Sequence, residues 1–337
     1  MPTPPQEPPY DQWVSTVDDA VLTASERGRT HTLGAPQAPR TWMRGAVHDA
    51  DGVLVRASVR PWSGDGAAPV AVDPERVRVP RRADRLEGTW RYAGNWAAHF
   101  GHFFLEVLPT LWGPDGERLG LLMHQAPRVP GLVRREPPRT PDLTPWQRDF
   151  LRLAGFGRDE IRIVMSTPIR VDRLVVPSRP VLLKSWAAPE AVEVWRRVSD
   201  AVGERGDSRR VFLSRTLFHR GEVKRDRSRR SEATWDAHLD RAFAAAGFTI
   251  VHPERLPLPE QLAIVRGAEV LAGASGSALH LSAFAREGTR VLEVGDTRSR
   301  AAPMPTQRMV DAACRHRTAF VPHLDADGLS RLLGTLD

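Results

Sequence analysis

The C-terminal half of the chain alternates short apolar runs with longer stretches in which apolar residues recur at helical spacing. Apolar strands that alternate with helices are typical of a parallel sheet covered on both faces. We therefore expect a Rossmann-like half over Arg209–Val294. Its predicted strands are Arg210–Arg215, Phe248–Pro253, Ala268–Gly273 and Thr289–Val294, and its predicted helices are Glu232–Ala246, Leu258–Gly267 and Ser277–Arg286.

The N-terminal half has a less regular pattern. Residues 1–40 are rich in proline and predict an irregular lead-in. Gly45–Arg60 predicts a hairpin, because two β-leaning runs flank a tight-turn tetrad. A linker around Pro177–Pro189 separates an N-terminal domain, residues 1–185, from a C-terminal domain, residues 190–337. The remaining predicted elements are helices at Ala97–Leu108, Trp146–Ala154 and Glu190–Val202 and strands at Leu119–Gln125, Ile161–Met165 and Arg173–Ser178.

Length and composition favour a globular cytoplasmic protein. The 337 residues are enough for two domains, and 41% of them are apolar. Cys314 is the single cysteine, so no internal disulfide can form, which fits a reducing compartment. The proline-rich N-terminus lacks the features of a secretory signal. The bias toward alanine, arginine, glycine and proline is typical of a high-GC bacterial genome.

The formal net charge of +7 comes almost entirely from arginine, since Lys184 and Lys224 are the two lysines. Arginine forms paired hydrogen bonds with phosphates and carboxylates. A dense basic cluster at Arg209–Arg230 leaves a nucleic-acid or anionic-surface binder open as one function. The cluster holds few aromatic residues, and the chain has no helix-turn-helix, zinc-finger or RNA-recognition signature.

The run Gly94–Trp112 is the strongest candidate for proton-transfer chemistry. His99, His102 and Glu106 follow one another at spacings of three and four residues, which places them on one face of a helix. Asn95, four residues before His99, is expected on the same line. Titratable groups on a helix with a large apolar face suit acid–base catalysis. The alternative is that the histidines are structural residues with satisfied hydrogen bonds.

The ends of the predicted C-terminal strands form a candidate phosphate site, because ligands of such sheets bind beyond the carboxyl ends of the strands. The small residues after Ala268–Gly273 let a ligand approach the backbone at a helix N-terminus. The loop is neither a Walker A motif nor GxGxxG. A solvated loop is the alternative for the arginines. The candidate residues are Ser214, Arg215, Arg220, Arg230, Glu254, Ser275, Gly276, Ser277 and Ala278.

Four segments in order resemble glycosyltransferase family 61, also known as DUF563, and its bacterial capsular-polysaccharide-like branch in particular. They cover much of Gly94–Val294, and they are HFGHFFLEVLPTLW (His99–Trp112), VFLSRTLFHRG (Val211–Gly221), RRSEATWDAHL (Arg229–Leu239) and the block Gly247–Val294.

The resemblance implies a GT-B fold, in which two Rossmann-like domains face each other across a cleft. It also implies inverting transfer of a sugar from a nucleotide-sugar to a hydroxyl acceptor, commonly without a metal ion. No other cofactor is expected. The expected partners are the nucleotide-sugar and a glycan or small-molecule acceptor, with no specific nucleic acid. Peripheral membrane contact and a homodimer stay open.

Two departures from the family pattern concern the donor side. Ser275-Gly276 stands where the family often has His-Gly, and Ser231-Glu232 where it often has Asn-Glu. They motivate a second hypothesis, a catalytically inactive scaffold that acts as a partner protein.

Within the family context, each candidate residue has an expected role. No DxD motif follows a strand, so Arg215, Arg220 and Arg230 and the amides of Ser275–Ala278 are expected to offset the leaving diphosphate. His102 is the favoured base with Glu106 orienting it. Glu106 as the base and a role for His99 stay open.

Overall fold

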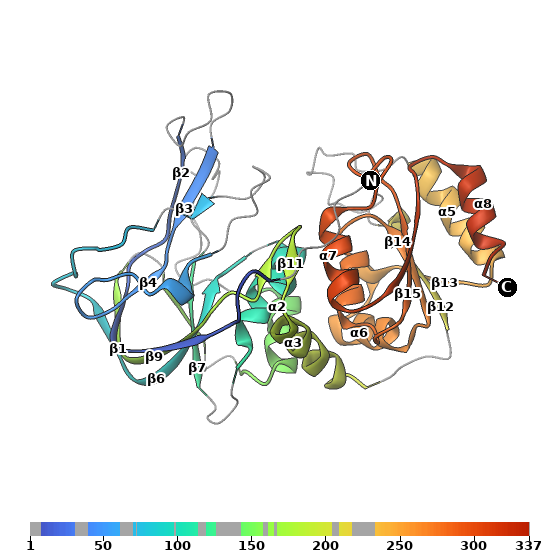
Figure 1. Ribbon diagram of the computed structural model, residues 1–337. Helices are drawn as coiled ribbons and strands as arrows, with labels where there is room; N and C mark the ends of the chain where they lie inside the picture. Colours follow the sequence, from blue (N-terminus) through green and yellow to red (C-terminus); the bar gives the residue numbers. More distant parts are fainter. Residues whose placement is uncertain are drawn as a thin grey trace. The chain divides into compact units, whose positions relative to one another are not determined.

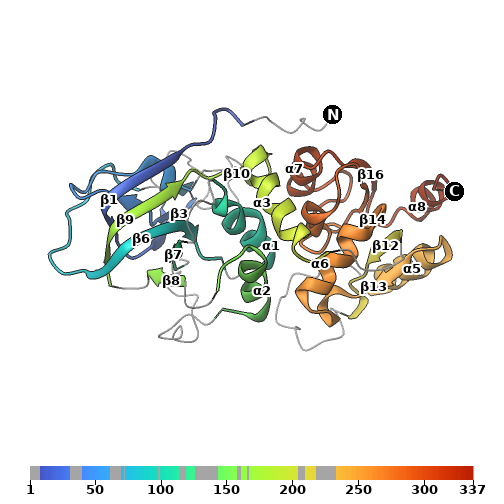
Figure 2. The same ribbon diagram turned by 90° about the horizontal axis from the view of Figure 1, so that it is seen from below.

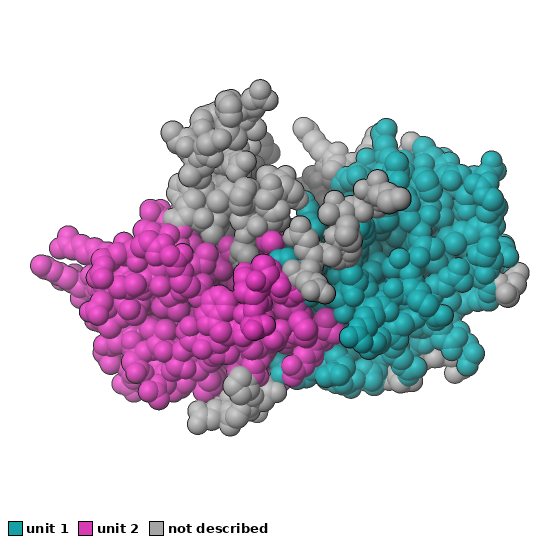
Figure 3. Space-filling model, in the orientation of Figure 1, with its two compact units in different colours: residues 1–7, 184–187, 195–337 teal, residues 8–183, 188–194 magenta. Residues whose placement is uncertain are grey.

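The structure is a computed structural model that describes residues 8–30, 40–60, 70–71, 73–97, 99–113, 119–125, 143–157, 161–164, 167–203, 209–217 and 233–336 (Figure 1). The described chain forms two compact units, coloured separately in Figure 3. The N-terminal unit comprises residues 8–183 and 188–194, and the C-terminal unit comprises residues 184–187 and those from 195 onward. The division falls inside helix α3 (Pro189–Asp200).

The C-terminal unit contains a five-stranded sheet in which every neighbouring pair is parallel. Its strand order is β13-β12-β14-β15-β16. This confirms the predicted parallel sheet and is compatible with a Rossmann-like fold. The last strand, β16, was not predicted. The bounds are β12 (Arg210–Leu213), β13 (Thr249–Val251), β14 (Val270–Ala274), β15 (Arg290–Val294) and β16 (Arg317–Val321).

Helices cover both faces of this sheet. Helices α5 and α8 lie on one side of it and α6 and α7 on the other (Figure 1). On the first side Phe212 stacks on Phe243, with ring centroids 4.2 Å apart, inside a cluster of buried apolar side chains. The helical elements are α5 (Ala233–Ala245), η5 (Pro253–Arg255), α6 (Leu258–Gly267), η6 (Leu279–Phe284), α7 (Pro305–Ala313) and α8 (Ala326–Leu333).

The N-terminal unit is built on a six-stranded mixed sheet of order β4-β1-β9-β6-β7-β8. Strands β9, β6, β7 and β8 are parallel, and β1 runs antiparallel to both β9 and β4. A small sheet is formed by β2, β3 and β5. The bounds are β1 (Val14–Leu22), β2 (Glu26–Thr30), β3 (Arg40–Arg44), β4 (Val47–His48), β5 (Val70–Ala71), β6 (Asp84–Asn95), β7 (Gly120–His124), β8 (Ile161–Val164), β9 (Ile169–Pro177) and β10 (Val181–Leu182). The short strand β11 (Trp186–Ala187) belongs to the C-terminal unit.

Two predictions for this unit were wrong in detail. The predicted irregular lead-in contains β1, which pairs with β9 along its whole length, and β2. The predicted hairpin has its turn, where Asp49 Oδ1 accepts hydrogen bonds from the amides of Asp51 and Val53 at 3.0 and 2.8 Å. After the turn, however, isolated bridges and the short helix η1 (Arg56–Ser58) replace the second strand.

Helical segments connect the parallel strands of the N-terminal unit. The connection from β6 to β7 contains a continuous helical segment made of α1 (Phe100–His102), the π-helix η2 (Phe103–Val107) and the 3-10 helix η3 (Leu108–Leu111). It replaces the predicted α-helix, and Pro109 lies inside η3 rather than ending the helix. Helix α2 (Pro145–Leu153) connects β7 to β8 and lies beside α1 (Figure 2).

Aromatic packing fixes these two helical segments against each other. Phe100 and Phe103 both meet the Trp146 ring edge-on, with centroids 5.2 and 5.4 Å apart. Phe104 lies against the fully buried Phe150. The apolar face of the first segment is thereby committed to the core, and its other face is left for polar residues.

No helix in the described part of the chain combines the length and the apolar character that a membrane crossing requires.

Candidate functional site

The carboxylate of one glutamate links the helical segment between β6 and β7 to the loop that follows η1. Oε2 of Glu106, in η2, accepts a hydrogen bond from Nδ1 of His102, four residues earlier. Oε1 of Glu106 accepts two hydrogen bonds from Arg60, from Nε at 2.9 Å and from Nη2 at 2.5 Å. We call Arg60, His102 and Glu106 the Glu106 cluster.

The Glu106 carboxylate is ionised at neutral pH. Burial by itself raises the pKa of Glu106, but the charge of Arg60 and the hydrogen bonds and charge of His102 outweigh burial and lower the pKa to about 2. The side chains of Arg60 and Glu106 are each 14% exposed, whereas His102 is 46% exposed. Because an ionised carboxylate only accepts hydrogen bonds, Nδ1 of His102 carries a proton, and Nε2 is left for a ligand.

His99 lies next to this cluster. It is the N-cap residue of α1, with extended backbone, and its ring meets the His102 ring edge-on at a centroid distance of 5.0 Å. The structure therefore brings His99, His102 and Glu106 together as predicted. Asn95 does not continue their line, because it ends β6 instead of belonging to the helix.

A buried arginine links the end of β6 to η1. Arg179 is 6% exposed, and its Nη2 donates to Asn95 Oδ1 at 2.8 Å and to the Ser58 carbonyl at 3.2 Å. Gly94 has φ of +78°, and a Cβ there would lie 2.6 Å from Nη1 of Arg179. Glycine is thus required at this position for two reasons, the backbone conformation and the close approach of the guanidinium. Burial lowers the pKa of Arg179.

The second candidate region lies at the carboxyl ends of β14 and β15, in the C-terminal unit. We call residues 274–278 the Ser275 loop. The Ser275 carbonyl accepts hydrogen bonds from Arg215 and, at 3.2 Å, from Nη2 of Arg298. Asp296, whose side chain is fully buried, pairs with Nη2 of Arg298 at 2.7 Å and with Nη1 of Arg215 at 3.7 Å. Two guanidinium groups therefore converge on one loop and share one carboxylate.

The Ser275 side chain has a different role from the one predicted. It is fully buried, and its hydroxyl donates to Glu293 Oε1 at 2.5 Å and accepts from the Ser299 hydroxyl at 2.6 Å. Its amide donates to the Val294 carbonyl at 2.8 Å. Neither group is left for a phosphate, so the prediction that the Ser275 amide offsets the leaving diphosphate was wrong.

The rest of the loop is a turn before the short helix η6. Ser277 and Ala278 are half-buried, and the helix that follows is shorter than the predicted Ser277–Arg286. Gly276 has φ of +139°, and a Cβ there would collide with Nη2 of Arg215. Glycine at this position lets the arginine approach the backbone.

The other predicted donor-side residues are placed as follows. Ser214 is buried, and its hydroxyl lies 2.9 Å from that of Thr216, which donates to Asp240 at 2.8 Å. Glu254 is exposed on η5. Arg220, Arg230 and Ser231 lie outside the described residues, as does most of the basic cluster.

Sequence reasoning missed three arginines and one acid. Asp296 and Arg298 follow β15, so the strand-end rule that identified Arg215 would also have identified them. Arg60 and Arg179 reach their partners over 46 and 84 residues of chain. No local signal in the sequence reports contacts of that kind.

The Glu106 cluster predicts a specific dependence of stability on pH. The pKa of Glu106 is depressed in the folded state from 4.5 to about 2. Its stabilising contribution is therefore complete above the unfolded-state pKa and is lost as the pH falls toward 2. We expect the free-energy difference of unfolding between wild type and Glu106→Gln to shrink by about 2 kcal/mol from pH 7 to pH 3.

Urea titrations at the two pH values measure this difference. Glu87→Gln, the same substitution at an exposed position of β6, serves as the control and should give a pH-independent difference. A Glu106→Gln difference that is equally large at pH 3 and pH 7 would contradict the ionised cluster.

The family model described as Glycosyltransferase 61 matches residues 100–292. The match includes Glu106, Arg215 and the Ser275 loop, and it covers more than half of the chain. No curated protein matches the sequence.

Proposed function

Because the chain belongs to glycosyltransferase family 61, we propose that it transfers a sugar from a nucleotide-sugar to a hydroxyl group of a glycan or small-molecule acceptor. The proposal includes inversion at the anomeric carbon and no requirement for a metal ion. The residue assignments rest mainly on the hydrogen bond between His102 Nδ1 and the ionised Glu106, which both lie inside the segment that the family model matches. Localisation in the bacterial cytoplasm belongs to the same proposal.

His102 is the general base in this proposal. The acceptor hydroxyl gives its proton to Nε2 of His102 while its oxygen forms a bond to the anomeric carbon. The bond between that carbon and the diphosphate oxygen breaks, and its electron pair stays with the diphosphate. Glu106 fixes the imidazole and stabilises the imidazolium that forms, as a carboxylate does in other histidine-based sites.

The electrostatics favour His102 over Glu106 as the base. A carboxylate with a pKa of about 2 is a weak proton acceptor at neutral pH. It is also already engaged by Arg60 on its other oxygen. His99, which contacts the His102 ring edge-on, is assigned to holding the acceptor.

The donor side of the proposal rests on arginine. Arg215 and Arg298 both reach the Ser275 loop, and guanidinium groups bind diphosphates through paired, charge-assisted hydrogen bonds. They would stabilise the negative charge that develops on the leaving group, together with Arg220 and Arg230. The GT-B arrangement is part of the same proposal and rests on the family resemblance. In it, residues 1–185 form the acceptor side and residues 190–337 bind the nucleotide-sugar.

The base assignment predicts a separation of rate from binding. His102→Ala should lower the turnover number for transfer or donor hydrolysis by about 10² to 10⁴. The Kd for the nucleoside diphosphate should stay within about two-fold, because His102 is not assigned to the donor. Release of nucleoside diphosphate and calorimetric titration measure the two quantities.

His99→Ala serves as the matched control for this test. It should lower turnover by less than about ten-fold, since His99 is not assigned to proton transfer. If His99→Ala abolishes turnover and His102→Ala does not, the base has been assigned to the wrong histidine.

The donor assignment predicts that Arg215→Ala weakens nucleoside diphosphate binding by about ten-fold or more, because a buried charge-assisted contact is lost. The control is Arg209→Ala, an exposed arginine that pairs with Glu269 just before the start of β12, at the opposite end of the same strand. A thermal-shift screen against a broad panel of nucleotides and nucleotide-sugars identifies the ligand first. If no member of the panel raises the melting temperature, the proposal of a nucleotide-sugar enzyme is wrong.

One observation favours the second candidate, an inactive scaffold. Ser275, which stands where the family often has histidine, uses its hydroxyl inside the protein and presents nothing to a donor. Measurable turnover of any nucleotide-sugar removes this alternative.

A further inference from the structure

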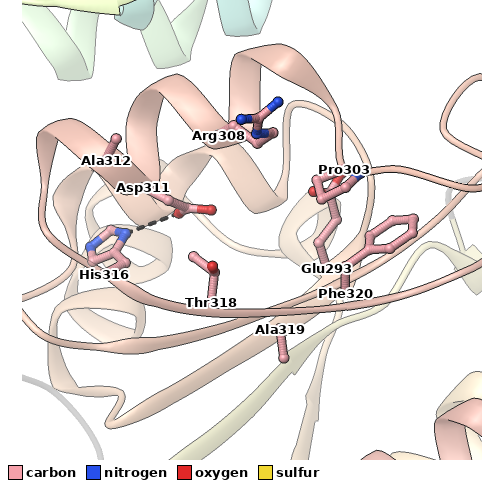
Figure 4. Close-up of a pocket in the computed structure, with 9 residues that line it drawn as sticks. All are labelled: Glu293, Pro303, Arg308, Asp311, Ala312, His316, Thr318, Ala319 and Phe320. Atoms are coloured by element: carbon pink, nitrogen blue, oxygen red, sulfur yellow. Dashed lines mark hydrogen bonds and ion pairs between the residues drawn. The ribbon is translucent and has the colours of Figure 1, made fainter. Parts of the chain in front are cut away.

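The C-terminal unit contains a pocket that the proposed reaction does not use. It lies between α7 and the strands β15 and β16, and its volume is about 370 Å³ (Figure 4). This volume is in the range of small-molecule sites. Pro303 and Phe320 contribute apolar wall, and Glu293, Asp311, His316 and Thr318 contribute polar groups. Figure 4 shows Glu293 and Thr318 pointing from the strands toward the helix that carries Asp311.

Glu293 presents an unpaired carboxylate oxygen in this wall. The residue is 3% exposed, and its Oε1 accepts hydrogen bonds from the Ser275 hydroxyl at 2.5 Å and from the Met304 amide at 3.1 Å. Its other oxygen, Oε2, is buried and has no hydrogen-bond partner among the described residues. Buried polar atoms in folded proteins nearly always have a partner.

His316 presents a second unpaired atom in the same pocket. Its side chain is fully buried, and Nδ1 lies 3.0 Å from Oδ1 of Asp311. In the tautomer whose Nδ1 donates this hydrogen bond to the carboxylate, Nε2 is an acceptor. Within the described part of the chain Nε2 has no partner either. Two buried polar atoms that line one pocket therefore have no hydrogen-bond partner among the described residues.

The carboxylates near Glu293 favour a cation. Burial, and to a smaller extent the nearby carboxylates of Asp311 and Asp296, raise the pKa of Glu293 to about 7. The hydrogen bonds from Ser275 and Met304 act in the opposite direction but do not outweigh these effects. Arg308 also lines the pocket, from α7. A group that carries positive charge and several N–H donors satisfies a buried carboxylate and an imidazole acceptor, whereas a hydroxyl has one donor to offer.

We propose that this pocket binds a small organic molecule with a primary ammonium group, placed on Oε2 of Glu293, and with its apolar part against Phe320 and Pro303. The bound ammonium group supplies the missing donors and keeps Glu293 ionised. This site is separate from the Ser275 loop, and the two regions are linked by the hydrogen bond from the Ser275 hydroxyl to Oε1 of Glu293.

Two probes of equal size test the requirement for charge. 2-Phenylethylamine carries an ammonium group where 2-phenylethanol has a hydroxyl, and both have a ring for the apolar wall. Calorimetric or ligand-observed NMR titration of the full chain at about pH 8, where Glu293 is ionised, gives both affinities. We expect the amine to bind at least about ten-fold more tightly than the alcohol. Equal affinities, or no amine binding up to about 10 mM, would overturn the proposal.

Substitutions in the pocket test whether the amine binds there. Glu293→Gln keeps the size of the side chain and should weaken amine binding by about ten-fold or more, with the alcohol unaffected. Glu287→Gln is the same substitution at a glutamate that is 70% exposed, and it should change neither affinity. If Glu293→Gln does not fold, Thr318→Trp fills the pocket from the edge strand and should abolish amine binding. Undiminished amine binding by a folded Glu293→Gln or Thr318→Trp variant contradicts the assigned site.

Discussion

The N-terminal site depends on the burial of one carboxylate. A carboxylate removed from water destabilises the fold unless charged partners and hydrogen bonds compensate it. Glu106 obtains that compensation from Arg60 on one oxygen and His102 on the other. The interaction holds the helix that joins β6 to β7 against the loop after η1, and it also determines which nitrogen of His102 carries the proton. The π-helical turn at Phe103–Val107 belongs to the same arrangement, because its apolar side chains are buried while Glu106 reaches the polar side. Such turns are frequent at functional sites.

The same principle applies at the Ser275 loop of the C-terminal unit, where a buried carboxylate is again compensated by cationic side chains. There the fully buried Asp296 holds two arginines, and both donate to the backbone of one loop. Glycine at position 276 allows the approach. A loop organised in this way presents positive charge without lysine, which agrees with a chain whose basic residues are almost all arginine. Each unit therefore contains a buried carboxylate that fixes cationic side chains, Glu106 in the N-terminal unit and Asp296 in the C-terminal unit.

The sequence predicts the regular parts of this structure well and the long-range contacts poorly. The bounds of α6 agree with the predicted Leu258–Gly267, and the parallel C-terminal sheet follows from the alternation of apolar strands and helices. Strand β1 was missed because four of its first six residues are polar, two of them aspartates, and because it follows a proline-rich segment. Arg60 was missed because its partner is 46 residues away. The role of Ser275 was predicted wrongly because its hydroxyl donates a hydrogen bond to Glu293, which belongs to the neighbouring strand of the sheet.

We infer that an ionised Glu106 holds His102 with its proton on Nδ1, so that Nε2 can accept a proton in the proposed reaction. The ¹⁵N chemical shifts of the His102 ring, measured by NMR at a pH where the ring is neutral, report this directly. We expect a protonated Nδ1 and an unprotonated Nε2, and a loss of that preference in Glu106→Gln. A neutral ring with its proton on Nε2 would contradict it.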